Sequence, residues 1–409
     1  MISIRFPSVL QTVRELPGGL CPVWIEPDGR FALIIKASKE MILTAQLRQE
    51  IKIYLVPGTE SDHQMLGLIT CFFDDHDEPL SITSPLFESD AMLEDVSQLL
   101  CQETFDLHMF DGNDRELFAT RACVQDAERL RTTFERSVFP GVDIDRIPAL
   151  LKAMGMWFGQ RTPADDAESI TVRFTEHLMP PDIGIIDLSG GDHDFRDIGH
   201  GLVVDSLERP DPGALQERDI AALLRQVFGR DAVFLNPLRA DTGKELTDVL
   251  VVTSDVILLV QAKDSPNTEA ALNRSIVRKR STIRSHVEKG ARQLQGALQF
   301  VMSGEAKIRR GDGIVAIEKG VRALRGALVV RELFEDDYKA SSAPVLKVSQ
   351  QTQVPCVLLD YAALLAMAKN LTTSEELVNG FDRLHGAAMQ HGEFPKPRFL
   401  PTQTIDGSC

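Results

Sequence analysis

The chain has 409 residues, of which 43% are hydrophobic, 25% charged and 6% aromatic. These fractions are typical of a globular protein. The formal net charge of -16 argues against a chain that coats nucleic acid or anionic membrane with its whole surface, and no apolar run approaches the ~18 residues of a transmembrane helix.

The length and the cysteines indicate the number of domains and the compartment of the protein. Single cores rarely exceed roughly 250–300 residues, so the length predicts two or three domains. The first residues lack the basic start and apolar run of a secretory signal. The six cysteines are scattered and form no C-x-x-C pair, which indicates reduced thiols and a cytoplasmic protein.

Residues 1–135 predict a β-rich N-terminal domain. Asp111-Gly112 between two apolar runs is a hairpin signal. The domain is acidic and shows no catalytic pattern, so its role stays open between binding and assembly. The expected strands are 31–36, 51–56 and 65–73, the hairpin joins 107–110 to 116–120, and the expected helices are 91–104 and 123–135.

Residues 136–211 predict a connecting, partly helical region, with a helix over 147–157. A Gly- and Asp-rich segment at 189–201 is typical of turns, while Asp192, His193, Asp194 and His200 also leave metal binding open. Pro210, Asp211, Pro212 and Gly213 mark a boundary.

Residues 212–375 predict an α/β domain in which helices flank a central mixed sheet, and 376–409 a C-terminal tail. The whole chain is therefore expected to be a multidomain α+β protein. The expected helices are 214–228, a long basic stretch over 268–302, and 360–370; the expected strands are 232–235, 246–253, 256–263, 327–330 and 355–360.

The hairpin formed by 246–253 and 256–263 brings polar side chains together. With Ser254 and Asp255 as the turn, Asp248 lies opposite Gln261, and Lys263 lies on the same face as Gln261. Polar groups at the end of a buried apolar strand are costly unless they pair or bind something. A simple Asp–Lys ion pair that caps the strand is one interpretation, and a catalytic cluster is the other.

The pattern Asp248, twelve residues, then Gln261-Ala262-Lys263 resembles the PD-(D/E)XK nucleases, the restriction-endonuclease-like superfamily. It is most similar to the Mrr-like branch with its D…QxK motif, over roughly residues 212–370. The resemblance implies that Asp248 is the main ligand of Mg²⁺ or Mn²⁺, with the Gln261 side chain and the Ala262 carbonyl as neutral oxygen ligands. It implies that Lys263 is the catalytic amine. Glu217 and Glu245 compete for the second carboxylate role, because Gln261 replaces the acid that the superfamily commonly has there.

Basic residues follow this cluster. The window 264–325 holds 13 Lys and Arg against 6 Asp and Glu, although the whole chain is acidic. Such a helix either follows a phosphate backbone or is a solvated face. By resemblance, Gln293 and Gln295 are expected to support the site. The residues expected to contact nucleic acid are Arg274, Arg278, Lys279, Arg280, Arg284, Lys289 and Arg292.

The resulting prediction is a divalent-metal-dependent nuclease that hydrolyses phosphodiester bonds, with DNA the favoured substrate and no membrane partner. The resemblance implies a bacterial restriction or antiviral defence effector. The acidic N-terminal half is expected to contact a protein partner or a second copy. Two alternatives remain: a degenerate nuclease-like domain that binds nucleic acid or acts as a scaffold, and a basic helix that only mediates assembly with an acidic partner.

Overall fold

The fold is described from a computed structural model. The structure describes residues 1–16, 18–25, 29–58, 63–75, 78–88, 91–180, 184, 206–209, 213–304, 306–310, 313–317, 320–334 and 337–397. The chain divides into two compact units. Unit 1 comprises Met1–Pro210 and Asn267–Arg274, and unit 2 comprises Asp211–Pro266 and Ser275–Cys409. The segments that we predicted as 1–135 and 136–211 fall in unit 1 except for Asp211, and those predicted as 212–375 and 376–409 fall mainly in unit 2.

Unit 1 is built on an eight-stranded sheet in the order β1-β2-β6-β7-β8-β3-β4-β5. Neighbouring strands are antiparallel except for the parallel pair β2 and β6. The strands are β1 (Gly19–Ile25), β2 (Arg30–Lys36), β3 (Glu50–Pro57), β4 (Met65–Phe72), β5 (Leu80–Pro85), β6 (Thr104–Phe110), β7 (Glu116–Val124) and β8 (Ile170–His177). The β-rich character expected from the sequence is therefore present.

Two helices of unit 1 begin at capping residues. Ser38 caps α3, and its side chain accepts a hydrogen bond from the Met41 backbone. Thr162 and Asp165 form a capping box on α7. The helices are α1 (Ile2–Arg5), α2 (Pro7–Glu15), α3 (Lys39–Arg48), α4 (Ala91–Leu100), α5 (Ala127–Arg136), α6 (Ile147–Gly159) and α7 (Pro163–Glu168), with the short helix η1 (Ile144–Arg146) before α6.

One further helix of unit 1 comes from a distant part of the sequence. The helix α9 (Glu269–Leu272) contacts α3, and Leu272 is buried in the unit 1 core. Asn267 is also buried, and its side-chain amide donates hydrogen bonds to the carbonyls of Leu207 (2.7 Å) and Lys39 (3.2 Å). Unit 1 is thus completed by residues that lie between two elements of unit 2.

Unit 2 contains a five-stranded mixed sheet in the order β16-β15-β12-β11-β9. β12, β15 and β16 are parallel, whereas β11 is antiparallel to both β12 and β9. The strands are β9 (Val233–Leu235), β11 (Val249–Val252), β12 (Val256–Lys263), β15 (Ala323–Val330) and β16 (Cys356–Asp360). The central mixed sheet predicted for this domain is present.

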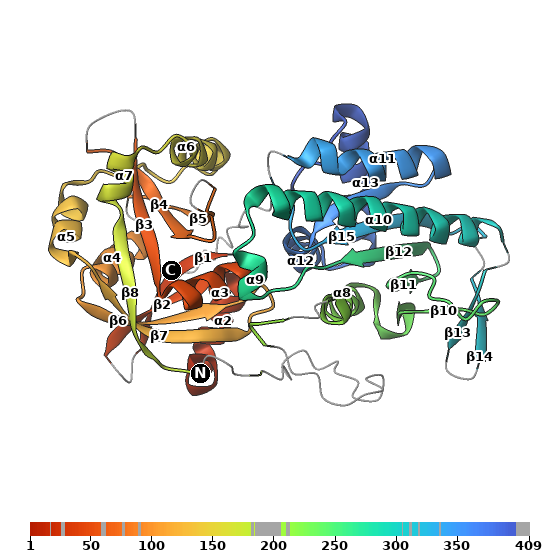
Figure 1. Ribbon diagram of the computed structural model, residues 1–409, viewed down its shortest axis with the longest axis horizontal. Helices are drawn as coiled ribbons and strands as arrows, with labels where there is room; N and C mark the ends of the chain where they lie inside the picture. Colours follow the sequence, from red (N-terminus) through yellow and green to blue (C-terminus); the bar gives the residue numbers. More distant parts are fainter. Residues whose placement is uncertain are drawn as a thin grey trace, which may run out of the picture. The chain divides into compact units, whose positions relative to one another are not determined.

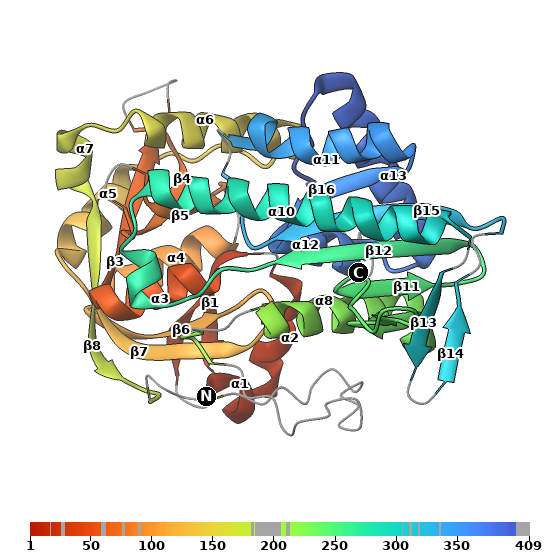
Figure 2. The same ribbon diagram turned by 45° about the vertical axis from the view of Figure 1, so that its right-hand side comes forward.

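Helices cover this sheet on both faces. In both ribbon views, α10 (Ile276–Met302) and α8 (Gly213–Phe228) lie on opposite sides of β12 (Figures 1 and 2). The helices α11 (Tyr338–Thr352), α12 (Tyr361–Asn370) and α13 (Ser374–His391) contact β16. A separate three-stranded sheet joins β10 (Leu238–Arg239), β13 (Lys307–Arg310) and β14 (Gly313–Ala316), and a short helix η2 (Arg230–Ala232) precedes β9.

Three segments expected over residues 212–409 have other bounds in the structure. The basic stretch 268–302 is two helices rather than one, because α9 ends at Leu272 and α10 begins at Ile276 after the N-cap Ser275. β11 is shorter than expected, since residues 246–248 leave the regular strand. The segment predicted as a tail begins inside α13. No helix in the described ranges is both long enough and apolar enough to cross a membrane.

Candidate active site

The hairpin of β11 and β12 sets the geometry of the candidate site. Val249 pairs with Val260, and the ladder continues to Val252 and Ile257. The Thr253 amide closes the turn by donating to the Val256 carbonyl at 2.9 Å. This is the register expected from a Ser254-Asp255 turn, and it places Asp248 opposite Gln261.

Asp248 is a buried hydrogen-bond acceptor at the end of this hairpin. It is 4% exposed, and Gln261 is 3% exposed. One carboxylate oxygen, Oδ2, accepts hydrogen bonds from the Gln261 side-chain amide and from the Ala262 backbone N–H, the latter at 2.5 Å. Asp248 therefore holds the end of β12 as well as presenting a carboxylate.

Lys263 brings a cation to the same carboxylate. Its Nζ lies 3.6 Å from Asp248 Oδ2 and donates to the Ala262 carbonyl at 2.6 Å. The structure thus brings together the predicted trio Asp248, Gln261 and Lys263. Leu246, which the same register would place opposite Lys263, lies before the regular part of β11.

Both candidates for the second carboxylate interact electrostatically with Asp248. Burial, then the negative charge of Asp248, raises the pKa of Glu217, while a hydrogen bond from Asn236 and the charge of Lys263 oppose the rise. Burial, then a hydrogen bond to Asp248 and its negative charge, raises the pKa of Glu245 to about 8. Both shifts therefore reflect burial first and the nearby Asp248 carboxylate second.

Two residues near Asp248 and Lys263 were not predicted from the sequence as part of the site. Asn236, just after β9, donates its backbone N–H to the Asp248 carbonyl at 2.8 Å. His286 on α10 has a buried Nδ1 without a hydrogen-bond partner, and burial, then the charges of Lys263 and Lys289, lowers its pKa. An isolated Asn or His carries no spacing signal in the sequence, so only the fold reveals these positions.

Gly290 explains how α10 approaches the strand that carries Lys263. A Cβ atom placed on Gly290 would lie 2.4 Å from Leu328 Cδ1 and 3.3 Å from Lys263 Cγ. A larger residue at this position would require the buried Leu328 side chain to move, so the glycine favours the close approach of the helix to β12 and β15. His286 lies one helical turn before Gly290, on the same side of α10.

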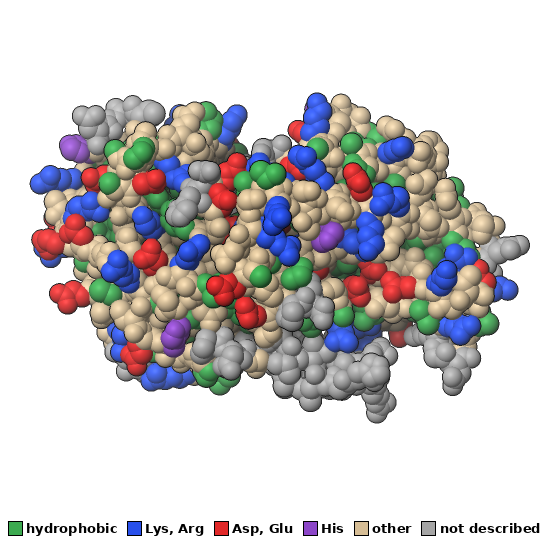
Figure 3. Space-filling view, viewed as in Figure 1, with side chains coloured by type: hydrophobic (Ala, Val, Ile, Leu, Met, Phe, Trp, Pro, Cys, Tyr) green, Lys and Arg blue, Asp and Glu red, His purple; other side chains and the backbone are tan. Residues whose placement is uncertain are grey.

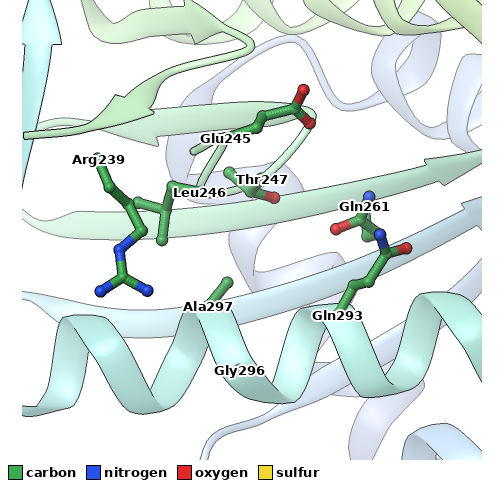
Figure 4. Close-up of a pocket in the computed structure, with 8 residues that line it drawn as sticks. All are labelled: Arg239, Glu245, Leu246, Thr247, Gln261, Gln293, Gly296 and Ala297. Carbon is green, nitrogen blue, oxygen red and sulfur yellow. The ribbon is translucent and has the colours of Figure 1, made fainter. Parts of the chain in front are cut away.

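A cavity of about 320 Å³ adjoins the cluster. Gln261 from β12 and Gln293 from α10 point toward one another at one end, and Arg239 lies at the other (Figure 4). Glu245 and Gln261 belong both to the cavity wall and to the cluster around Asp248. Gln293 therefore lies where a supporting residue was expected, whereas Gln295 is not among the residues that line the cavity.

The cations expected to contact nucleic acid divide into three groups. Arg278, Lys289 and Arg292 are exposed on α10 and form no ion pair with any residue that the structure describes, and Lys and Arg side chains are visible over α10 in Figure 3. Arg284 instead binds the buried Asp337 through two hydrogen bonds from Nε, at 2.8 and 3.0 Å, and one from Nη2.

The remaining three basic residues have other surroundings. The Arg280 guanidinium lies 5.7 Å from the centre of the Phe334 ring. Lys279 is half-buried on α10. Arg274 belongs to unit 1, outside the unit that carries Asp248.

The donor set suits a hard divalent cation such as Mg²⁺ or Mn²⁺, which binds oxygen ligands. Asp248, Glu217 and Glu245 supply carboxylate oxygens, and the buried Asn236 Oδ1 has no hydrogen-bond partner. Among the described residues, no group of three or more His, Cys, Asp or Glu side chains is arranged to hold a metal ion. A cation here would therefore need neutral oxygens as well. Gln261 and Ala262 were expected to supply them; in the structure the Gln261 amide donates to Asp248, and the Ala262 carbonyl accepts a hydrogen bond from Lys263.

The metal-binding alternative at Asp192, His193, Asp194 and His200 lies outside the described residues. Asp360, the last residue of β16, has a structural role as the N-cap of α12. Its side chain accepts a 2.7 Å hydrogen bond from the Ala363 backbone.

Comparisons with known proteins give little further information. No protein-family model matches the chain, and no curated protein matches it. Among solved structures, the restriction endonuclease FokI bound to DNA is 10% identical, with a TM-score of 0.20. The match covers 64% of this chain and 44% of the FokI chain, less than half of that protein's length. Such a score carries no structural argument, so the functional argument rests on the site.

Proposed function

We propose that the chain is a divalent-metal-dependent nuclease that hydrolyses phosphodiester bonds in nucleic acid, with DNA the favoured substrate. The observation that carries the proposal is the cluster of Asp248, Gln261 and Lys263 at the end of the β11–β12 hairpin, with Glu217 and Glu245 beside it. A buried carboxylate with a lysine and two further acids at one sheet end offers the kinds of groups that metal-assisted phosphodiester hydrolysis uses.

In this proposal, Asp248 holds the cation together with the Gln261 and Ala262 oxygens, and Glu217 or Glu245 adds a second carboxylate. A bound Mg²⁺ or Mn²⁺ would polarise the phosphoryl oxygen and lower the pKa of a water molecule. Lys263 orients the attacking water or stabilises the negative charge that develops on the phosphate. The exposed cations Arg278, Lys289 and Arg292 hold the phosphate backbone.

The wider setting of the proposal comes from the resemblance to Mrr-like nucleases, which favours a bacterial restriction or antiviral defence effector. In that setting unit 1 would contact a partner or a second copy, or hold the nuclease in check. The acidic composition of the chain outside the basic window is compatible with a protein partner rather than with further nucleic acid.

The experiment is cleavage of plasmid DNA, single-stranded DNA and RNA with Mg²⁺ or Mn²⁺, and with EDTA. Asp248→Ala and Lys263→Ala should abolish cleavage. Matched controls are Asp255→Ala, at the opposite end of the same hairpin, and Lys347→Ala, exposed on α11. Both controls should cut like wild type. Cleavage that persists in EDTA, or in Asp248→Ala, would refute the proposal.

A second function is favoured by one feature of the site. The Gln261 amide and the Lys263 ammonium already satisfy Asp248 without a metal, and an amide stands where the superfamily commonly has an acid. A domain of this kind could serve as a nucleic-acid-binding or scaffold subunit. It would bind DNA in a salt-dependent manner, bind no Mn²⁺ at Asp248, and cut nothing under any of the conditions above.

A further inference from the structure

Asn236 occupies a defined position beside Asp248. Leu235 pairs with Val249 in the β9–β11 ladder, and the next pair in this register is Asn236 and Asp248. The hydrogen bond from the Asn236 backbone to the Asp248 carbonyl, 2.8 Å long, continues the ladder by one step. Asn236, Asp248 and Gln261 therefore form one row across three neighbouring strands, with Asp248 in the middle.

The Asn236 side chain reaches a different element. Its Nδ2 donates a 3.1 Å hydrogen bond to Oε2 of Glu217 on α8. A single residue thus binds the strand that carries Asp248 through its backbone and the helix that carries Glu217 through its side chain. This is the side-chain hydrogen bond that the structure gives the Glu217 carboxylate, and it opposes the repulsion of Asp248 together with the charges of Lys263 and Arg218.

Two further features set Asn236 apart from an ordinary strand-end residue. Its backbone is left-handed, with φ 48°, a conformation that costs energy for any residue with a Cβ and that Asn tolerates better than most. Its Oδ1 is buried and accepts no hydrogen bond. An unsatisfied buried acceptor is costly, and next to acidic groups it is a neutral oxygen that suits a hard cation.

From these contacts we propose that Asn236 is a positioning residue of the candidate metal site, which holds the Glu217 carboxylate in place as a cation ligand beside Asp248. The inference rests on the proposed function. The role of Asn236 extends the proposed function, because it selects Glu217 as the second carboxylate that is positioned for the cation. It also gives a reason for a left-handed Asn at this position.

The test is Mn²⁺ binding to the full chain, measured by isothermal titration calorimetry, beside thermal unfolding without metal. Asn236→Gly keeps the left-handed backbone and removes the side chain. It should weaken Mn²⁺ binding about 10–100-fold, as loss of an outer-shell partner typically does. The matched control is Gln353→Gly, which makes the same change at another left-handed residue of unit 2, at the end of α11. The control should bind Mn²⁺ like wild type.

A double-mutant cycle separates positioning from a general structural effect. If Asn236 acts through Glu217, the variant with both Asn236→Gly and Glu217→Gln should bind Mn²⁺ no more weakly than Glu217→Gln alone. Losses that add independently would overturn the inference, and so would wild-type affinity in Asn236→Gly. If Asn236→Gly does not fold, Asn236→Asp replaces it: the donor is lost, so affinity should fall even though a negative charge is added, and a rise would overturn the inference.

The same experiment distinguishes the two proposals. Mn²⁺ binding by wild type that Asp248→Ala abolishes, together with unchanged binding by Asn236→Gly, would overturn the role of Asn236 and leave the proposed function standing. Absence of Mn²⁺ binding by wild type would overturn both.

Discussion

Glu245 holds a proton at neutral pH that a cation would have to displace. Its pKa is raised to about 8, chiefly by burial and then by Asp248, so the carboxyl group is largely neutral at pH 7. A cation binds the ionised form, and we therefore expect Mn²⁺ affinity to rise as the pH increases from 6 to 9. Calorimetry in buffers of different ionisation enthalpy should detect proton release at pH 7.

The control for this prediction is Glu245→Gln, which removes the titrating group. Proton release should shrink and the rise in affinity should flatten. If affinity in wild type were constant between pH 6 and 9, Glu245 would not be coupled to the cation.

Asp248 should matter for stability as well as for catalysis. Its carboxylate accepts hydrogen bonds from the Gln261 amide and the Ala262 backbone, both buried. Asp248→Ala leaves these donors unsatisfied and should lower the free energy of unfolding by about 1–3 kcal/mol for each unpaired group. Urea unfolding measures the loss. Asp248→Asn keeps the shape and one oxygen and should lose less, and equal losses would contradict this account.

Several residues of the site could be predicted from the sequence and others could not. The Ser254-Asp255 turn and the two-residue period of strand side chains predicted the register, and therefore that Asp248, Gln261 and Lys263 lie together. Asn236 and His286 could not be predicted. Their roles depend on a left-handed backbone and on the rotation of α10, which no short-range pattern encodes.

At the scale of elements, Gly290 controls how closely α10 approaches the sheet. Gly290→Ala should drive a methyl group into Leu328 and disturb Lys263, which lowers the free energy of unfolding by about 1–3 kcal/mol. Gly296→Ala is the matched control on the same helix, because a Cβ atom there meets nothing within 4 Å. It should stabilise by about 0.5–1 kcal/mol. Urea unfolding of both variants checks the difference in sign.

The exposed basic residues of α10 predict that DNA binding weakens as the salt concentration rises. Removing Arg278, Lys289 or Arg292 should reduce the slope of log K against log salt by about 0.9 for each lost phosphate contact. Arg284→Ala should instead lower stability, because Arg284 is bound to the buried Asp337. Fluorescence anisotropy with labelled DNA between 50 and 200 mM salt, about the range over which such contacts are lost, measures the slopes. An unchanged slope in the triple variant would contradict a phosphate-binding role.

The elements missed by the sequence analysis each have a physical reason. α13 begins with a complete capping box, Thr373 and Glu376, so its signal was present in the sequence. α11 contains Pro344, which conceals its helical pattern. All four residues of β14 are exposed, so that strand shows no alternation. The basic stretch looked continuous because its charge runs across the break between α9 and α10.

At the scale of the molecule, the stability of unit 1 depends on α9, a helix that lies between β12 and α10 in the sequence. Leu272 is buried in the core of unit 1, so Leu272→Ala should lower the free energy of unfolding of that unit by about 2–5 kcal/mol. Hydrogen exchange should show faster exchange in α3, which contacts α9, and unchanged exchange in β12 and β15. Leu272→Met, a change of similar volume, should have little effect, and faster exchange confined to unit 2 would contradict the assignment.

Because unit 1 is built from two separate parts of the sequence, the order of translation affects how it folds during synthesis. Domains generally fold as units during synthesis, the N-terminal one first. Here residues 1–210 emerge without Asn267 and Leu272, and β9, β11 and β12 must be translated before those residues appear. During synthesis the N-terminal unit therefore lacks Asn267 and Leu272 until the segments that carry Asp248 and Lys263 have left the exit tunnel. The last piece of the first unit and the first half of the second sheet become available to fold at nearly the same moment of translation.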